Sequence, residues 1–226
     1  MNAKVLGLSG VLGSTAVGGG IYLSMRGTQE SISNLLSSEK AILPIKESSD
    51  PKWNEVWKKY KEFNGGINKW GLKDWDKQQK ETNAPEEFKN ACESRSLMKV
   101  SNKEQQEYKD VKEWCTRPKK VSELLNSEGK RVLLNQSEDS AEWKNLWTQY
   151  KKHHENTPKT GDSTTYKTSD ELGVNNWSSK TSQEEAPEEF KNACKTKSES
   201  YIDETKITED QTFKRVMLWC TKAKTK

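Results

Sequence analysis

Two stretches of the chain carry apolar residues at positions i, i+3, i+4 and i+7, the spacing that places side chains on one face of a helix. The first stripe consists of Trp53, Val56, Trp57 and Tyr60, and the second of Trp143, Leu146, Trp147 and Tyr150. Before the first stripe, Asp50 can cap a helix and Pro51 fits its first position. The pattern predicts two amphipathic helices with aromatic inner faces.

Each stripe is followed by two shorter helical patterns. Pro85 and Pro187 can each open a helix, and the two glutamates that follow suit the positive end of its dipole. The inner positions of these later helices are Phe88, Ala91 and Cys92, then Tyr108, Val111 and Cys115, with Phe213, Val216 and Cys220 at the end of the chain. The intervening segments around Trp75 and Trp177 are looser. Residues 97–100 and 200–202 fit either a short strand or a loop.

An internal duplication explains why these patterns come in pairs. The nine residues at 84–92 recur letter for letter at 186–194. Further matches in the same order are Leu35–Leu36 with Leu124–Leu125, Trp75 with Trp177, and Trp114 with Trp219. Self-similarity of this kind indicates two copies of one module. We expect a first copy at 28–118 and a second at 119–226. The offset between them changes from 90 to 102 residues, so the second copy has a 12-residue, Ser/Thr-rich insertion near 159–170.

The first 27 residues differ from both copies. Residues 5–25 carry no charge and include six glycines. A helix of this length spans roughly 31 Å, close to the hydrocarbon thickness of a bilayer. We expect a signal anchor at 1–27 that contacts the lipid bilayer through residues 5–25. Small residues four apart would also allow homo-association through this Gly-rich helix. A signal peptide cleaved after Ala16 is the alternative.

Composition points to small folded modules. Hydrophobic residues make up 31% and charged residues 32% of the chain, a balance that also occurs in disordered proteins. Nine Trp at recurring positions favour folding instead, because small domains need large side chains to build a core. The predicted core consists of Trp53, Trp57, Tyr60, Phe88, Trp114, Trp143, Trp147, Tyr150, Phe190 and Trp219. Trp70 has no counterpart in the second copy and is the best candidate for an exposed aromatic ring.

Charge and motifs narrow the function classes. With 38 basic and 34 acidic residues, the chain lacks the concentrated positive charge that nucleic-acid binding requires. It contains no His-Glu-x-x-His, Gly-x-Ser-x-Gly or P-loop sequence. The only histidines, His153 and His154, end a polar helix in one copy, and we expect them to be solvated. We therefore expect neither an enzyme nor a bound cofactor or metal.

The four cysteines occupy equivalent places in the two copies. An even number of cysteines behind an export-type leader is typical of disulfides, which predicts Cys92–Cys115 and Cys194–Cys220. Free buried thiols are the alternative. A zinc site is disfavoured, since the sequence contains no Cys-x-x-Cys pair. Disulfides persist outside the reducing cytoplasm, so we expect the body of the chain to be extracellular.

Together these motifs resemble the paralogous Trp/Cys-motif surface proteins of haemotropic mycoplasmas. The resemblance rests on the Gly-rich leader, the Trp-x-x-x-Trp-x-x-Tyr helix, the Ala-Pro-Glu-Glu-Phe-Lys-Asn-Ala-Cys block and the Trp-Cys-Thr near each module end. It covers nearly the whole chain, although the commonest form is expected to have one module. It implies a surface location on a wall-less bacterium that lives on red blood cells, with a part in antigenic variation. It supplies no catalytic residues.

The sequence therefore predicts a mainly α-helical chain, with one transmembrane helix followed by two small disulfide-linked modules. We expect a single-pass cell-membrane protein that displays antigen or adhesin modules, with a host surface protein or an antibody as partner. Two alternatives stay open: a membrane-tethered hydrolase, which needs a cleft with convergent polar groups, and a structural surface protein that associates with itself.

Overall fold

The computed structural model describes residues 29–63, 65–156 and 164–224. Contacts divide these residues into two compact units. The first contains the residues up to Leu35 together with Trp53–Cys115, and the second contains Leu36–Lys52 and the chain from Thr116 onward. The predicted membrane anchor at 5–25 lies outside the described residues. None of the helices that are described is both long enough and apolar enough to cross a membrane.

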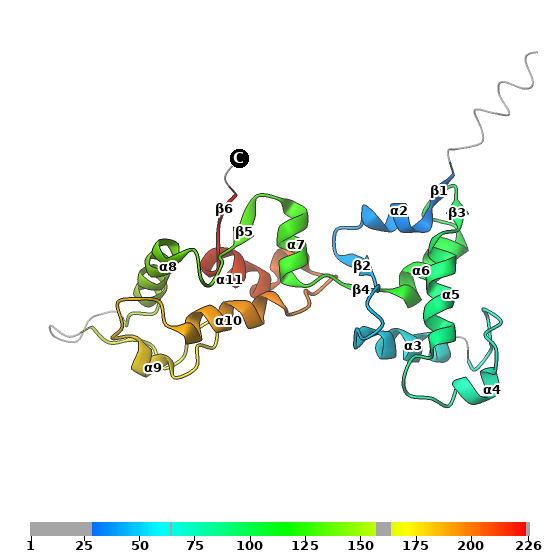
Figure 1. Ribbon diagram of the computed structural model, residues 1–226, viewed down its shortest axis with the longest axis horizontal. Helices are drawn as coiled ribbons and strands as arrows, with labels where there is room; N and C mark the ends of the chain where they lie inside the picture. The colour runs from blue at the N-terminus through cyan, green and yellow to red at the C-terminus, as the bar shows by residue number, and fades with distance from the viewer. Residues whose placement is uncertain (1–28, 64, 157–163, 225–226) are drawn as a thin grey trace, which may run out of the picture. The chain divides into compact units, whose positions relative to one another are not determined.

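The first unit is built from helices around an aromatic core (Figure 1). Its elements are β1 (Glu30–Ser31), the start of α2 (Ile32–Ser37), α3 (Lys52–Phe63), α4 (Trp75–Gln78), α5 (Glu86–Ser96), β3 (Lys99–Val100) and α6 (Gln106–Cys115). The two short strands pair antiparallel, with Glu30 opposite Val100. Residues 97–100, which the sequence assigned to either a short strand or a loop, thus end in a strand.

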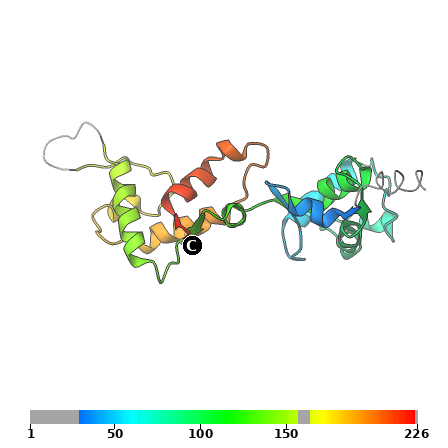
Figure 2. The ribbon, with the colours of Figure 1, turned by 90° about the horizontal axis from the view of Figure 1, so that it is seen from above.

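The second unit repeats this order of helices (Figures 1 and 2). It contains β2 (Ile42–Pro44), β4 (Thr116–Pro118), α7 (Val121–Glu128), β5 (Arg131–Leu133), α8 (Ser140–His153), α9 (Trp177–Lys180), α10 (Glu188–Ser198), η1 (Ile207–Glu209), α11 (Gln211–Trp219) and β6 (Thr221–Ala223). Strand β2 pairs with β4, and β5 pairs with β6, both antiparallel. In the other segment that the sequence did not decide, Tyr201 forms an isolated β-bridge with Lys120 and not a strand.

The principal helices begin where the sequence predicts. The Asp50 carboxylate accepts a hydrogen bond from the Lys52 backbone N–H at 2.9 Å, which satisfies one free donor at the start of α3. Helices α5 and α10 follow Pro85 and Pro187. The mainly α-helical fold is confirmed, while the short strands were too brief for a period-two pattern to reveal them.

Equivalent hydrogen bonds show that the two copies fold in the same way. The indole Nε1 of Trp57 donates to the Glu81 carbonyl at 3.1 Å, and that of Trp147 donates to the Gln183 carbonyl at 3.0 Å. The Trp70 backbone N–H donates to the Tyr60 hydroxyl at 2.9 Å, and the Leu172 N–H donates to the Tyr150 hydroxyl at the same distance. The duplicated letters therefore specify duplicated local structure.

The loops before α4 and α9 share an unusual backbone. Asp74 and Asn176 have φ values of 50° and 55°, in the left-handed region. Asp and Asn enter this region more readily than most residues. Gly71 and Gly173, three positions earlier, are also left-handed, with φ of 66° and 74°. The two copies therefore keep the same loop path into the short helix despite different side chains.

The join between the copies is not a solvated linker. Lys119 is 4% exposed, and its backbone N–H donates to the Ala41 carbonyl at 2.8 Å. The neighbouring Arg117 bonds both oxygens of the Glu123 carboxylate, at 2.7 and 2.8 Å, and its Nε donates to Asp50 at 2.8 Å. All of these residues belong to the second unit, so its structure begins before the second sequence copy does.

Candidate functional site

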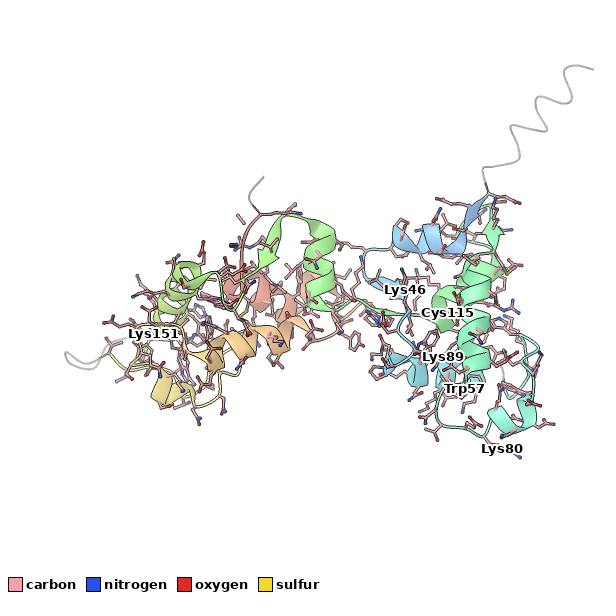
Figure 3. The ribbon with its side chains drawn as sticks, in the orientation of Figure 1. Lys46, Trp57, Lys80, Lys89, Cys115 and Lys151 are labelled. Carbon is pink, nitrogen blue, oxygen red and sulfur yellow. A yellow bond between two sulfur atoms is a disulfide. The ribbon has the colours of Figure 1, made fainter. Side chains whose placement is uncertain are left out.

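One disulfide closes each copy at the same place. Cys92 is bonded to Cys115 and Cys194 to Cys220, and the Cα–Cα distance is 5.5 Å in both. Each bond joins the second long helix of its copy to the end of the third. The predicted pairing is confirmed, and free thiols are not found. Figure 3 labels Cys115 and Trp57 among the side chains of the first unit.

The aromatic residues predicted to form the core lie in the interior. All ten are at most 5% exposed: Trp53, Trp57, Tyr60, Phe88, Trp114, Trp143, Trp147, Tyr150, Phe190 and Trp219. In the first unit the Tyr60 ring centroid lies 5.2 Å from Phe88 and 5.1 Å from Trp114. In the second, Tyr150 lies 5.0 Å from Phe190 and 5.2 Å from Trp219. Each tyrosine is therefore the centre of its core.

The expectation that Trp70 is an exposed ring is wrong. Phe88 stacks on one face at 5.7 Å with an interplanar angle of 19°. The Arg95 guanidinium lies over the ring at 4.8 Å. These contacts leave the ring half-buried rather than exposed. Trp70 instead extends the core of the first unit.

The expectation that both histidines are solvated is wrong for His154, which is 1% exposed. Its ring lies 4.4 Å from the ring of Tyr150. The loop that leads to α9 covers it, since the Glu171 backbone N–H donates to His154 Nε2 at 3.2 Å. A signal for this burial was present in the sequence. His154 is four residues after Tyr150, so it continues the apolar stripe of α8 by one more turn.

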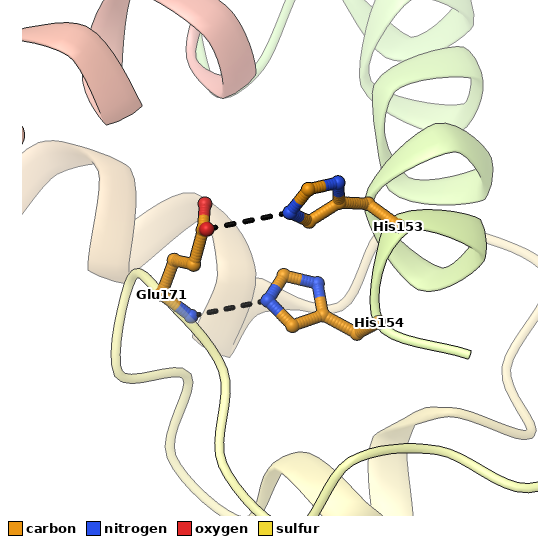
Figure 4. Close-up of side chains that lie close together, drawn as sticks. All are labelled: His153, His154 and Glu171. Atoms are coloured by element: carbon orange, nitrogen blue, oxygen red, sulfur yellow. Dashed lines mark hydrogen bonds and ion pairs between the residues drawn. The ribbon is translucent and has the colours of Figure 1, made fainter. Parts of the chain in front are cut away.

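The hydrogen bonds of His154 determine its tautomer. Nε2 accepts from the Glu171 N–H, so the ring proton is on Nδ1, which donates to the Tyr150 carbonyl at 2.8 Å. Burial lowers the pKa of His154 by more than its bond to the Tyr150 carbonyl raises it. The ring is thus held neutral, with the lone pair of Nε2 directed toward Glu171 (Figure 4).

Glu171 and His153 complete the cluster. Glu171 Oε1 lies 3.3 Å from His153 Nε2, and Oε2 accepts from Trp219 Nε1 at 3.2 Å. Partial burial alone would raise the pKa of Glu171, but the bonds from Trp219 and His153 lower it overall. The carboxylate is therefore ionised at neutral pH. His153 packs its ring 5.3 Å from that of Trp219, and its side chain remains 45% exposed.

These three side chains could hold a metal ion. One ligand atom from each of His153, His154 and Glu171 lies within 4.8 Å of the other two. Sequence reasoning missed the cluster because Glu171 follows the insertion, 17 residues after His154. No spacing motif links the three residues, and only the folded loop brings them together.

A second feature is an open depression that both units carry beside the second long helix. In the first unit, residues 70–72 and helix α5 line a depression of about 610 Å³. In the second unit, the corresponding loop and α10 line one of about 350 Å³. The matched lining residues are Gly71 and Gly173, Glu87 and Glu189, Asn90 and Asn192, Ser94 and Thr196, and Arg95 and Lys197. These groups offer hydrogen bonds and charge to a polar partner.

Comparison with known proteins adds no relative. No protein-family model matches the sequence, and neither a curated protein nor a solved structure matches it. The resemblance to the surface proteins of haemotropic mycoplasmas stays a prediction.

Proposed function

We propose that the chain is a membrane-anchored display protein of the cell surface, which presents two disulfide-linked helical modules to the exterior as antigen, adhesin or both. The observation that carries the proposal is the pair of equivalent disulfides, Cys92–Cys115 and Cys194–Cys220. Disulfides form and persist in oxidising surroundings and are rare in the cytosol. A protein with one disulfide in each of its two modules is suited to the outside of the cell.

A constant interior with different surface loops supports display. The two copies keep the same aromatic residues around Tyr60 and Tyr150. They differ at 64–74 and 156–175, where the second copy has its insertion. Loops on the surface of a rigid frame tolerate changes of length and composition better than the helices they connect. Such a protein can alter what a host recognises while its modules remain folded.

The shared depression beside α5 and α10 supports contact with another molecule. Asn90 and Asn192 are exposed, and the core needs neither of their side chains. Both copies nevertheless keep an amide, a hydroxyl and a cation along the same helix face. Two equivalent weak sites on one chain would strengthen binding to a surface that repeats its ligand, because the second contact becomes intramolecular.

The membrane attachment rests on the sequence of residues 5–25. An uncharged stretch of this length fits a bilayer-spanning helix. The mycoplasma resemblance favours the same location and adds a role in host interaction or antigenic variation. In this proposal the anchor positions the modules, and the modules make the contacts.

Protease treatment of intact cells tests the proposal. The expected result is that added protease removes both modules and leaves a short membrane-bound fragment, while a cytoplasmic protein of the same cells stays intact. Sera from infected hosts should bind the intact cells, and this binding should be lost after the treatment. Modules that become sensitive only after the membrane is broken would contradict both the topology and the display role.

A further inference from the structure

We propose that His153, His154 and Glu171 form a Zn²⁺ site in the second unit. Two imidazoles and one carboxylate are a common ligand set for zinc in proteins, with water or another donor completing the coordination. The three side chains come from the end of α8 and from the loop before α9. The ion would therefore join the helix end to the loop that follows the insertion.

The distances fit an ion held by nitrogen and oxygen. Two donors that each lie about 2.0–2.1 Å from a tetrahedral ion are roughly 3.3 Å apart. His153 Nε2 and Glu171 Oε1 are already 3.3 Å apart. The His154 ligand atom lies within 4.8 Å of both, so this part of the site must contract slightly on binding. His153 and Glu171 are 45% and 35% exposed, which leaves room for the adjustment and for a water ligand.

Two of the ligands are already oriented by their neighbours. His154 Nδ1 donates to the Tyr150 carbonyl at 2.8 Å, which leaves the Nε2 lone pair on the side of Glu171, where it accepts from the backbone N–H of that residue. Glu171 Oε2 is held by Trp219 Nε1 at 3.2 Å, which leaves Oε1 for an ion. Supporting bonds of this kind, to a backbone carbonyl and to a ligating carboxylate, are characteristic of metal sites.

Binding has one identifiable cost. The Glu171 backbone N–H donates to His154 Nε2 at 3.2 Å, and coordination of Nε2 would replace this bond. The bond is longer than an average N–H···O or N–H···N contact, so its loss is small beside two nitrogen–metal bonds. The backbone N–H lies in a partly buried loop, so the site must shift enough to give it a new acceptor.

The first copy provides an internal comparison because it lacks the ligands. Phe63 stands at the place of His153 and packs 5.4 Å from Trp114. Lys69 stands at the place of Glu171, with its Nζ 5.0 Å from the Trp114 ring. The module thus folds without a metal ligand at either position. This argues that His153 and Glu171 of the second copy are not required for folding alone.

Titration of the full chain with Zn²⁺ tests the proposal. The protein should be purified without a histidine tag and with its disulfides intact, and the binding of ZnCl₂ followed by calorimetry. Co²⁺ provides a second probe through the visible absorption of its protein complexes. We expect one saturable ion per chain. His153→Phe, which installs the residue of the first copy, should weaken binding by at least about 100-fold, because even the loss of supporting groups costs 10–100-fold.

Two more variants separate ligation from folding. Glu171→Gln keeps an acceptor for Trp219 but removes the charged ligand, and it should also weaken binding by at least about 10-fold. Phe63→His is the matched control, since it adds a histidine beside Lys69 and should create no second site. The proposal is overturned if the wild type binds no stoichiometric ion, or if His153→Phe and Glu171→Gln, folded by circular dichroism, both bind as the wild type does.

Discussion

Lys69 and Glu171 occupy equivalent places in the two copies, yet they carry opposite charges. Lys69 lies over the Trp114 ring and forms an ion pair with Asp110 at 2.8 Å. Glu171 accepts a hydrogen bond from Trp219 and contacts His153. The residue that matches Asp110 is Arg215, which donates to the Glu171 carbonyl oxygen at 3.2 Å. The first copy thus has a cation in the loop and an anion on the helix, and the second copy has the reverse.

The exchanged charges also change whether the indole N–H of the equivalent tryptophans, Trp114 and Trp219, has a hydrogen-bond acceptor. Trp219 Nε1 has an acceptor in Glu171, whereas the buried Trp114 Nε1 has none within the described part of the chain. The ring beside the central tyrosine also differs. Trp70 packs on Tyr60 from the loop, while His154 packs on Tyr150 from the end of α8. The aromatic frame and disulfide are therefore constant, and the polar residues at its edge are free to diverge.

The largest expected effect comes from the part that both copies share. Trp57→Ala and Trp147→Ala should each lower the free energy of unfolding by about 3–5 kcal/mol, the usual range for truncating a core aromatic. Both rings are 0% exposed. Hydrogen exchange of backbone amides should show the loss in the unit that carries the substitution and little change in the other. A loss below about 1 kcal/mol would contradict a core role.

Removal of either disulfide should have a nearly equal effect in the two copies. The Cys92→Ala/Cys115→Ala and Cys194→Ala/Cys220→Ala variants should each lose about 3 kcal/mol, mainly because the unfolded chain gains freedom. The sequence separations are 23 and 26 residues, so the loop terms differ by roughly 0.1 kcal/mol. Urea unfolding of both variants measures this. A loss confined to one copy would show that the modules do not depend on the bond in the same way.

Trp70 and Leu172 occupy equivalent places in the two loops. Substituting each by the residue of the other copy tests whether the two cores differ there. Trp70→Leu should cost about 1–3 kcal/mol, because the space between Phe88 and Arg95 is left partly empty. Leu172→Trp should cost a similar amount by overpacking, about 1–3 kcal/mol, since Leu172 is 1% exposed. Thermal unfolding of each variant provides the measurement. If either substitution is neutral, the two loops are interchangeable and the comparison loses its basis.

The smallest expected effect concerns the exchanged charges. Asp110 is largely buried while Lys69 remains 34% exposed, and ion pairs that stay open to solvent contribute about 0.2–1 kcal/mol. Lys69→Glu places two carboxylates together, and Asp110→Arg should then restore an attraction. We expect a coupling of about 1 kcal/mol between the two substitutions in a double-mutant cycle. A coupling near zero would mean that Lys69 and Asp110 act independently.

The sequence predicted those features that depend on local spacing or on the duplication. The helix of Trp53, Trp57 and Tyr60 follows from its period, and the cysteine pairing follows from the equivalent places of Cys92 and Cys194. Comparison of two copies within one chain provided information that a single copy would not. The repeated letters marked which aromatic residues the fold needs.

The remaining features depend on tertiary structure. His154 is buried because a loop that follows an insertion returns over the end of α8. Trp70 is half-buried because Arg95, on a later helix, packs over its ring. The strand pairs are only two or three residues long, too short for an alternating pattern. Local periodicity contains no information about such contacts between distant segments.

The most direct test of an extracellular protein with two separately closed modules is the redox state of its four cysteines in the native membrane. Intact cells are treated with a thiol-alkylating reagent before lysis, and the protein is then mapped by mass spectrometry without reduction. We predict no alkylated cysteine and only two linked peptide pairs, Cys92 with Cys115 and Cys194 with Cys220. Four alkylated thiols, or a bond between the two copies, would contradict an extracellular protein built from two separately closed modules.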